Sequence, residues 1–162
     1  MKLRDIVIAV VILGVIGFIL YNISTPDNTP QLEATPNTNT VESDLEDRFR
    51  REIPDDVEKT ELEGTVEGTS VSALAIRNFE NGLYTASVLA DLEAPSDGTS
   101  YYAWINRGEE YVRLGMLQSA KGGWLIDYES STDYSEYDRV VVSEESAPGA
   151  EPQDVVLEGT FE

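Results

Sequence analysis

The sequence predicts an all-β protein: a seven-stranded antiparallel β-sandwich preceded by one transmembrane helix and a disordered stalk. Three observations support this fold class. Residues 6–21 form an uncharged, almost entirely apolar run, and residues 22–43 are polar and rich in Thr, Asn and Pro. After Thr69, short runs of alternating apolar and polar residues are separated by turn-forming residues, which is typical of sheets with one buried face.

The apolar run is long enough to serve as a membrane anchor. Residues 6–20 carry no charged or hydrogen-bonding side chain, so as a helix they cover roughly 22 Å. A bilayer core is about 30 Å thick, and Tyr21, Lys2 and Arg4 can reach the two interfaces and close the gap. We therefore expect a transmembrane anchor in contact with membrane lipid. A cleaved signal peptide and a buried core helix are the alternatives.

Charges on either side of the run predict the orientation. Lys2 and Arg4 precede it, whereas Asp27 and Glu33 are the first charged residues after it. Positive residues favour the cytoplasmic side. We expect a cell-membrane protein with a single span, a cytoplasmic stub at residues 1–5 and an extracytoplasmic C-terminal domain.

A flexible linker and a short helix are expected next. The composition of residues 22–43 cannot bury enough apolar surface to offset the entropy of ordering. Ser43 and Glu46 have the spacing of a capping box, which predicts a helix over residues 44–53. Its apolar face is formed by Leu45, Phe49 and Ile53.

The extracytoplasmic β-sandwich domain is assigned to residues 61–162. Asn81-Gly82 is the clearest turn signal, because both central residues of a type I′ hairpin turn need positive φ. Other Gly-containing turns separate the later runs. The expected strands are residues 71–79, 83–92, 101–106, 111–118, 123–128, 139–143 and 155–161.

Composition excludes several functional classes. The chain has 31 acidic and 11 basic residues, a formal net charge of -20, and neither Cys nor His. Such a charge repels nucleic acid, and a serine nucleophile would lack a histidine base. We predict no enzyme activity, no catalytic residue, no cofactor and no metal site, and expect binding or sensing instead.

Three segments carry a family resemblance. Residues 98–105 read GTSYYAWI, residues 114–117 read LGML, and residues 140–144 read VVVSE before Pro148-Gly149. In order and spacing these segments resemble the C-terminal extracytoplasmic domain of the anti-sigma-K factor family. The resemblance covers about Gly68 to Glu162. The positions that match the family motifs are Gly98, Tyr101, Trp104, Gly115 and Glu144.

The resemblance implies a membrane-tethered, sensor-like β-sandwich whose cytoplasmic part holds a sigma factor until proteolysis releases it. Only residues 1–5 precede the predicted anchor, so we expect an ectodomain without the sigma-binding module and no direct sigma factor binding. Glu145 and Ala150 also depart from the family pattern. The alternatives are an accessory subunit of a transmembrane anti-sigma system and an acidic envelope structural protein.

A loop rich in tyrosine and carboxylate is the candidate ligand surface for an unknown protein or envelope ligand. Tyrosine offers rigid contact area, and loops at the end of a sandwich often bind. Oxygen-rich loops can also hold Ca²⁺, but the spacing is not that of an EF-hand. A solvated loop that partly covers the sandwich end is the simpler alternative. The candidate residues are Tyr128, Asp133, Tyr134 and Tyr137.

The strand around Trp104 predicts which aromatic side chain enters the core. Successive side chains of a strand point to opposite faces, so Tyr101 and Trp104 cannot share one face without a bulge. We assign Trp104 to the core because it is the largest apolar group, and expect Tyr101 to be partly exposed.

Overall fold

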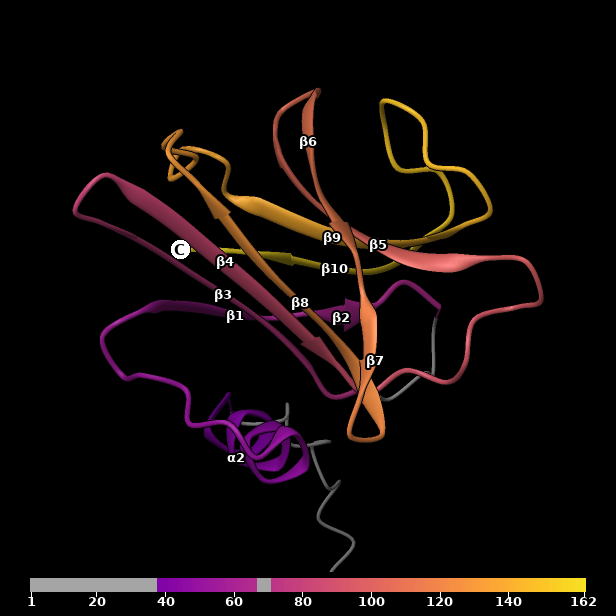
Figure 1. The fold of residues 1–162 in the computed structure, drawn as a ribbon, viewed down its shortest axis with the longest axis horizontal. Coiled ribbons are helices and arrows are strands. Elements are labelled where there is room, and N and C mark those ends of the chain that lie inside the picture. The colour runs from indigo at the N-terminus through magenta and orange to yellow at the C-terminus, as the bar shows by residue number, and fades with distance from the viewer. Residues whose placement is uncertain (1–37, 67–70) are drawn as a thin grey trace, which may run out of the picture. The chain divides into compact units, whose positions relative to one another are not determined.

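The computed structural model describes residues 38–66 and 71–162. They form two antiparallel sheets and one short helix (Figure 1). The predicted anchor, residues 6–21, and most of the predicted linker lie outside the described residues. Within the described part of the chain, no helix combines the length and apolarity needed to cross a bilayer.

Each sheet has five strands. Sheet A has the order β1-β3-β4-β8-β7 and sheet B the order β2-β10-β9-β5-β6. Sheet A consists of β1 (Glu58–Glu61), β3 (Ala73–Glu80), β4 (Leu83–Ala90), β8 (Gly123–Ser130) and β7 (Gln118–Ala120). Sheet B consists of β2 (Glu63–Gly64), β10 (Val155–Thr160), β9 (Arg139–Glu145), β5 (Ser100–Arg107) and β6 (Glu110–Met116).

The predicted count of seven strands is wrong, because both sheet edges turn a corner. Leu62 alone separates β1 from β2, and Leu117 alone separates β6 from β7. Both leucines are buried between the sheets. Each edge therefore belongs to one strand that leaves one sheet and enters the other. The strand formed by β1 and β2 was not predicted, because its residues are largely acidic and show no alternation of apolar and polar side chains.

Helix α2 (Thr38–Phe49) covers part of the outer face of sheet A. It begins earlier than the predicted helix over residues 44–53, because Val41 joins its apolar face. It also ends earlier, because Arg50 adopts a left-handed φ of 50° that stops it. The Glu46 carboxylate accepts a hydrogen bond from the Ile53 amide at 2.7 Å. Glu46 therefore stabilises the chain that follows the helix and does not cap a helix N-terminus at Ser43, which the sequence predicted. The apolar contact joins Val41, Leu45, Phe49 and Ile53 to Leu74, Ile76 and Leu89.

Strand β5 separates Tyr101 and Trp104 as its alternation predicts, but with the faces exchanged. Tyr101 packs in the core between the sheets and is 5% exposed, so the prediction of a partly exposed Tyr101 is wrong. Trp104 is 1% exposed but lies on the opposite face of sheet B. Its indole nitrogen donates to Ser143 Oγ at 2.8 Å, and the Arg113 guanidinium carbon lies 5.6 Å from the ring centroid. These partners bury the indole outside the inter-sheet core.

Positive φ angles occur at a hairpin turn and at a β-bulge, and each of these sites contains a glycine. Asn81 and Gly82 have φ of 54° and 78°, which confirms the predicted hairpin turn. Gly115 has φ of 146° beside a bulge where Leu114 is the extra residue of β6. A Cβ at Gly115 would lie 3.0 Å from Ile126 Cδ1. Glycine at this family-motif position therefore serves the packing between the sheets.

Candidate functional site

Four tyrosines gather at one end of the sandwich, which we call the tyrosine end. Tyr134 packs edge-on against Tyr84 and Tyr137, with ring centroids 5.5 and 5.3 Å away, and its ring is tilted against that of Tyr128 at 6.4 Å. Tyr84 is the second residue of β4 and Tyr128 lies near the end of β8, whereas Tyr134 and Tyr137 come from the connection between β8 and β9. The structure thus brings the predicted Tyr128, Tyr134 and Tyr137 together, with Tyr84 as a fourth member.

The connection between β8 and β9, residues 131–138, is tied down near its C-terminal end. The Tyr137 carbonyl accepts a hydrogen bond from Arg77 Nη1 at 2.8 Å, and its hydroxyl donates to Glu110 Oε1 at 2.6 Å. Arg107 pairs with Glu136 and also lies over the Tyr137 ring, 5.1 Å from its centroid. Several contacts from three parts of the chain therefore fix residues 136–138.

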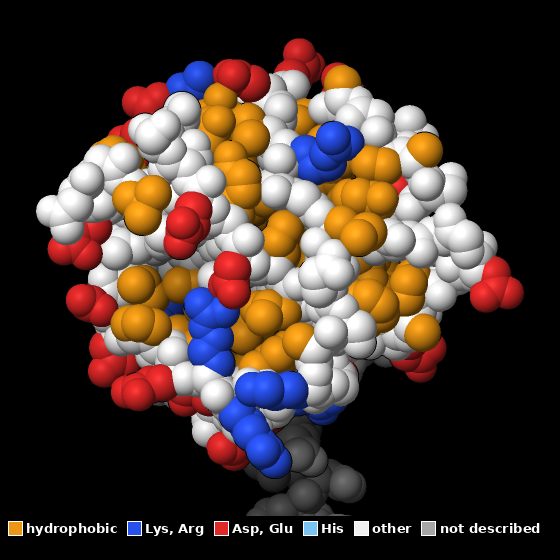
Figure 2. Space-filling model, in the orientation of Figure 1, with side chains coloured by type: hydrophobic (Ala, Val, Ile, Leu, Met, Phe, Trp, Pro, Cys, Tyr) orange, Lys and Arg blue, Asp and Glu red, His pale blue; other side chains and the backbone are white. Residues whose placement is uncertain are grey.

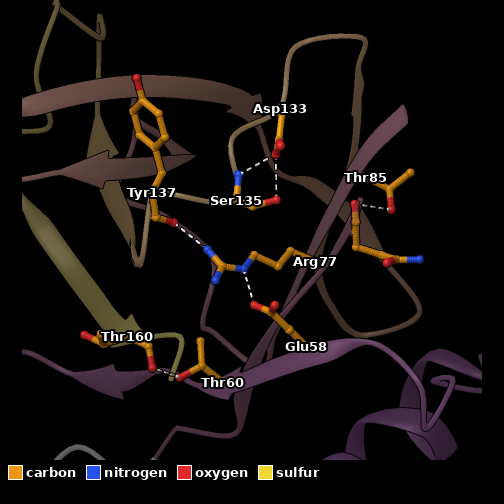
Figure 3. Close-up of polar contacts among 9 residues, drawn as sticks. Glu58, Thr60, Arg77, Thr85, Asp133, Ser135, Tyr137 and Thr160 are labelled. Carbon is orange, nitrogen blue, oxygen red and sulfur yellow. Dashed lines mark hydrogen bonds and ion pairs between the residues drawn. The ribbon is translucent and has the colours of Figure 1, made fainter. Parts of the chain in front are cut away.

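Arg77 holds this end of the core together (Figure 3). It is 7% exposed and shares the inner face of β3 with Ala73 and Ala75. Its Nε donates to Glu58 Oε2 at 2.5 Å, and its guanidinium carbon stands 4.2 Å from the Phe161 ring centroid. A buried arginine needs such partners because an unpaired buried charge is costly.

The first half of the same connection is held differently. Asp133 Oδ1 accepts hydrogen bonds from the Ser135 amide at 2.9 Å and from its hydroxyl at 2.6 Å, as Figure 3 shows. These bonds hold the pKa of Asp133 below its usual value. The Thr132 amide donates to Ser130 Oγ at 2.9 Å. Among the described residues, the hydrogen bonds made by the backbone of residues 131–135 stay within the segment 130–137.

The hydroxyl of Tyr84 stands out in this cluster. Tyr84 is fully buried, and among the described residues its hydroxyl oxygen has no hydrogen-bond partner. Burial raises the pKa of Tyr84 to about 12, although the nearby Arg77 charge opposes the rise. A hydrogen bond to Glu110 raises the pKa of Tyr137 and lowers that of Glu110. Both phenols remain neutral near pH 7.

The predicted ligand residues are unequally accessible. Tyr137 is 7% exposed and faces the core, Tyr128 and Tyr134 are partly buried, and Asp133 is exposed. Arg77 and Tyr84 were not among the predicted site residues. A signal for Arg77 was present, because its position two residues after Ala75 places it on the same face of the strand.

No family model, curated protein or solved structure matches the chain. The likeness to anti-sigma-K ectodomains therefore remains a prediction from the motif residues themselves.

The residues that match the family motifs contribute to turns and packing in this structure. Gly98 adopts a φ of 85° in the turn before β5. The Glu144 carboxylate accepts hydrogen bonds from the Thr99 hydroxyl and the Ser96 amide, both at 2.7 Å, and these bonds lower its pKa. Together with the buried Trp104, these contacts explain the motif by packing and turn geometry rather than by ligand contacts.

A groove of about 350 Å³ crosses the outer face of sheet A beyond helix α2. At its rim Asp127 Oδ1 accepts hydrogen bonds from Arg51 and Ser87, both at 2.6 Å. Burial opposes ionisation of Asp127, but the hydrogen bonds from Ser87 and Arg51, together with the Arg51 charge, outweigh it and lower the pKa. Figure 2 shows basic side chains gathered at the end of the molecule where helix α2 lies, with acidic side chains around much of the outline. Arg48 there pairs with Asp91 at 2.6 Å.

Nowhere in residues 38–66 and 71–162 do three carboxylate side chains come together in an arrangement that could hold an ion. In the loop considered for Ca²⁺, Asp133 is engaged with Ser135.

Proposed function

We propose that the chain is a membrane-tethered extracytoplasmic domain that binds a partner through the tyrosine end. One observation carries the proposal: residues 136–138 are fixed to a two-sheet scaffold by Arg77, Arg107 and Glu110. A loop held on a rigid scaffold loses little entropy when a partner binds it. The sheet corners at both edges add to that rigidity.

The charge of the surface limits the partner. Asp133 and Glu136 are exposed at this end, and the chain as a whole carries a net charge of -20. An anionic partner would be repelled. The proposed partner is therefore a neutral or basic region of a protein or envelope component, which meets tyrosine edges and carboxylates.

Site-specific crosslinking tests the binding surface. A photoreactive residue at Glu136 in the full-length protein, expressed in its membrane, should capture a discrete partner. The same residue at Asp97, an exposed position in the turn before β5, is the control. Capture from position 136 alone supports the proposal. Equal capture from both positions, or capture from position 97 alone, would rule out the tyrosine end.

The membrane tether is proposed from residues 6–21 and the basic residues before them. Protease added to intact cells or spheroplasts should remove the domain. If the domain is digested only after the membrane is lysed, the proposed orientation is reversed.

A further inference from the structure

We propose that residues 131–135 form a lid over the tyrosine end, and that this lid opens while the two sheets remain folded. The inference rests on the contacts within the domain. Its consequence for a partner, which would meet either the closed or the open end, rests on the proposed function.

The lid is held less firmly than the residues that follow it. Hydrogen bonds from Arg77 and to Glu110 fix Tyr137, and the Phe161 amide donates to the Asp138 carbonyl at 2.7 Å. The hydrogen bonds made by the backbone of residues 131–135, by contrast, stay within the segment 130–137 in the described part of the chain. Opening of the lid can break these local bonds without breaking any backbone pair of the sheets. Residues 136–138 therefore provide a fixed hinge for it.

The packing of the lid depends on one side chain. Tyr134 lies nearly perpendicular to Tyr84 and to Tyr137, with interplanar angles of 83° and 87°. Opening breaks these ring contacts and the Tyr134 contact with Tyr128. No backbone pair of either sheet includes residues 131–135. The sheets can therefore keep their ladders when Tyr134 leaves.

Closing the lid leaves a destabilising buried hydroxyl beneath it. Tyr84 contacts Tyr134 directly and is fully buried, yet its hydroxyl has no partner among the described residues. A buried donor without an acceptor is destabilising because it has lost its hydrogen bonds to water. When the lid opens, water can reach this hydroxyl. The recovered hydration offsets part of the lost ring packing, which lowers the free energy of opening.

Native-state hydrogen exchange tests the lid without any ligand. In the full-length protein in detergent micelles, the reporters are the Tyr137 amide, bonded to the Tyr134 carbonyl at 2.9 Å, and the Ser135 amide. Ladder amides of β4 and β8 serve as the reference. We expect the two reporters to exchange faster than the ladder and to depend little on low urea concentrations, because a local opening exposes little surface.

The variant Tyr84→Phe removes this hydroxyl and leaves the ring in place. Exchange of the Ser135 and Tyr137 amides should then slow by about fivefold or more. Tyr101→Phe is the matched control, because the Tyr101 hydroxyl donates to the Glu93 carbonyl at 3.4 Å at the other end of the sandwich. It should not slow exchange of the two reporters.

Two results would overturn the proposal. If the reporters share the protection and urea dependence of the ladder amides, residues 131–135 do not open separately. If Tyr84→Phe leaves reporter exchange unchanged or faster, the hydroxyl does not bias the lid. Either result leaves the crosslinking test of the binding surface intact, so failure of the lid and failure of the proposed function are distinguishable.

Discussion

The two ends of the sandwich differ in how the polar atoms of their buried aromatic side chains are hydrogen-bonded. At the end opposite the tyrosines, which we call the tryptophan end, Tyr101 packs edge-on against Trp124 with ring centroids 5.3 Å apart. The Trp124 indole nitrogen donates to the Leu92 carbonyl at 3.1 Å, and the Tyr101 hydroxyl donates to Glu93. At the tyrosine end the hydroxyl of Tyr84 is buried without a partner in the described chain.

The connections that cross the two ends differ in the same way. Residues 91–99 of the tryptophan end supply acceptors to both rings and are tied to β9 through Glu144. Among the described residues, the hydrogen bonds and ion pairs that tie residues 131–138 of the tyrosine end to distant parts of the chain are made by residues 136–138. The difference teaches that aromatic packing alone does not seal the end of a core. Paired polar atoms decide which end stays closed and which can open.

The largest expected effect comes from Trp104, which lies on β5 between the two ends. Trp104→Ala should lower the free energy of unfolding by about 3 to 5 kcal/mol, because a large buried ring is lost. Urea denaturation of the full-length protein in micelles measures this. Ser143→Ala, which removes only the acceptor of the indole nitrogen, should cost about 1 to 3 kcal/mol. A Trp104 variant within about 1 kcal/mol of the parent would show that the indole is not buried.

Arg77 should matter chiefly at the tyrosine end. Arg77→Met leaves the Tyr137 carbonyl without its donor, and the expected cost is about 2 kcal/mol. Glu58 adds little to this figure because its side chain is 56% exposed and stays hydrated. The control is Arg139→Met. Arg139 pairs with Glu158 where both side chains are nearly half exposed, so its loss should cost less than about 1 kcal/mol. Equal costs for the two arginine variants would contradict the role given to Arg77.

Acid should weaken both ends, because each contains a carboxylate with a lowered pKa. Hydrogen bonds lower the pKa of Glu144 at the tryptophan end and of Glu110 at the tyrosine end. A lowered folded pKa gives stability that is present above the unfolded pKa and is lost as the pH falls through the folded pKa. Thermal unfolding below the ordinary value of 4.5 should show this loss.

The variants Glu144→Gln and Glu110→Gln test the assignment of that loss. Each should flatten the fall in melting temperature on the acid side, since one titrating group is removed. If neither variant changes the acid limb, other carboxylates control it.

Much of the fold followed from local sequence patterns. Alternation and turn residues located the strands after Thr69, and Asn81-Gly82 forms the expected hairpin turn. The start of helix α2 depends instead on which side chains are buried against sheet A. The helix starts before Ser43 because Val41 joins its apolar face against sheet A, an interaction that a capping box does not reveal.

The candidate site was predicted only in part, for two physical reasons. The size of Trp104 suggested the inter-sheet core, but Ser143 and Arg113 allow an indole to be buried on the other face. Tyr84 and Arg77 are separated in sequence from the predicted loop, and only pairing of β3, β4 and β8 brings them beneath it. Such long-range placement has no local signal.

The most direct test of the difference between the two ends is equilibrium urea unfolding of Tyr84→Phe beside Tyr101→Phe. Removing the Tyr84 hydroxyl, which has no partner among the described residues, should raise the free energy of unfolding by about 1 kcal/mol. Removing the Tyr101 hydroxyl breaks a long hydrogen bond of 3.4 Å and should leave stability unchanged or slightly lower. A Tyr84→Phe variant less stable than the parent would show that its hydroxyl is paired in solution, and the two ends would then be sealed alike.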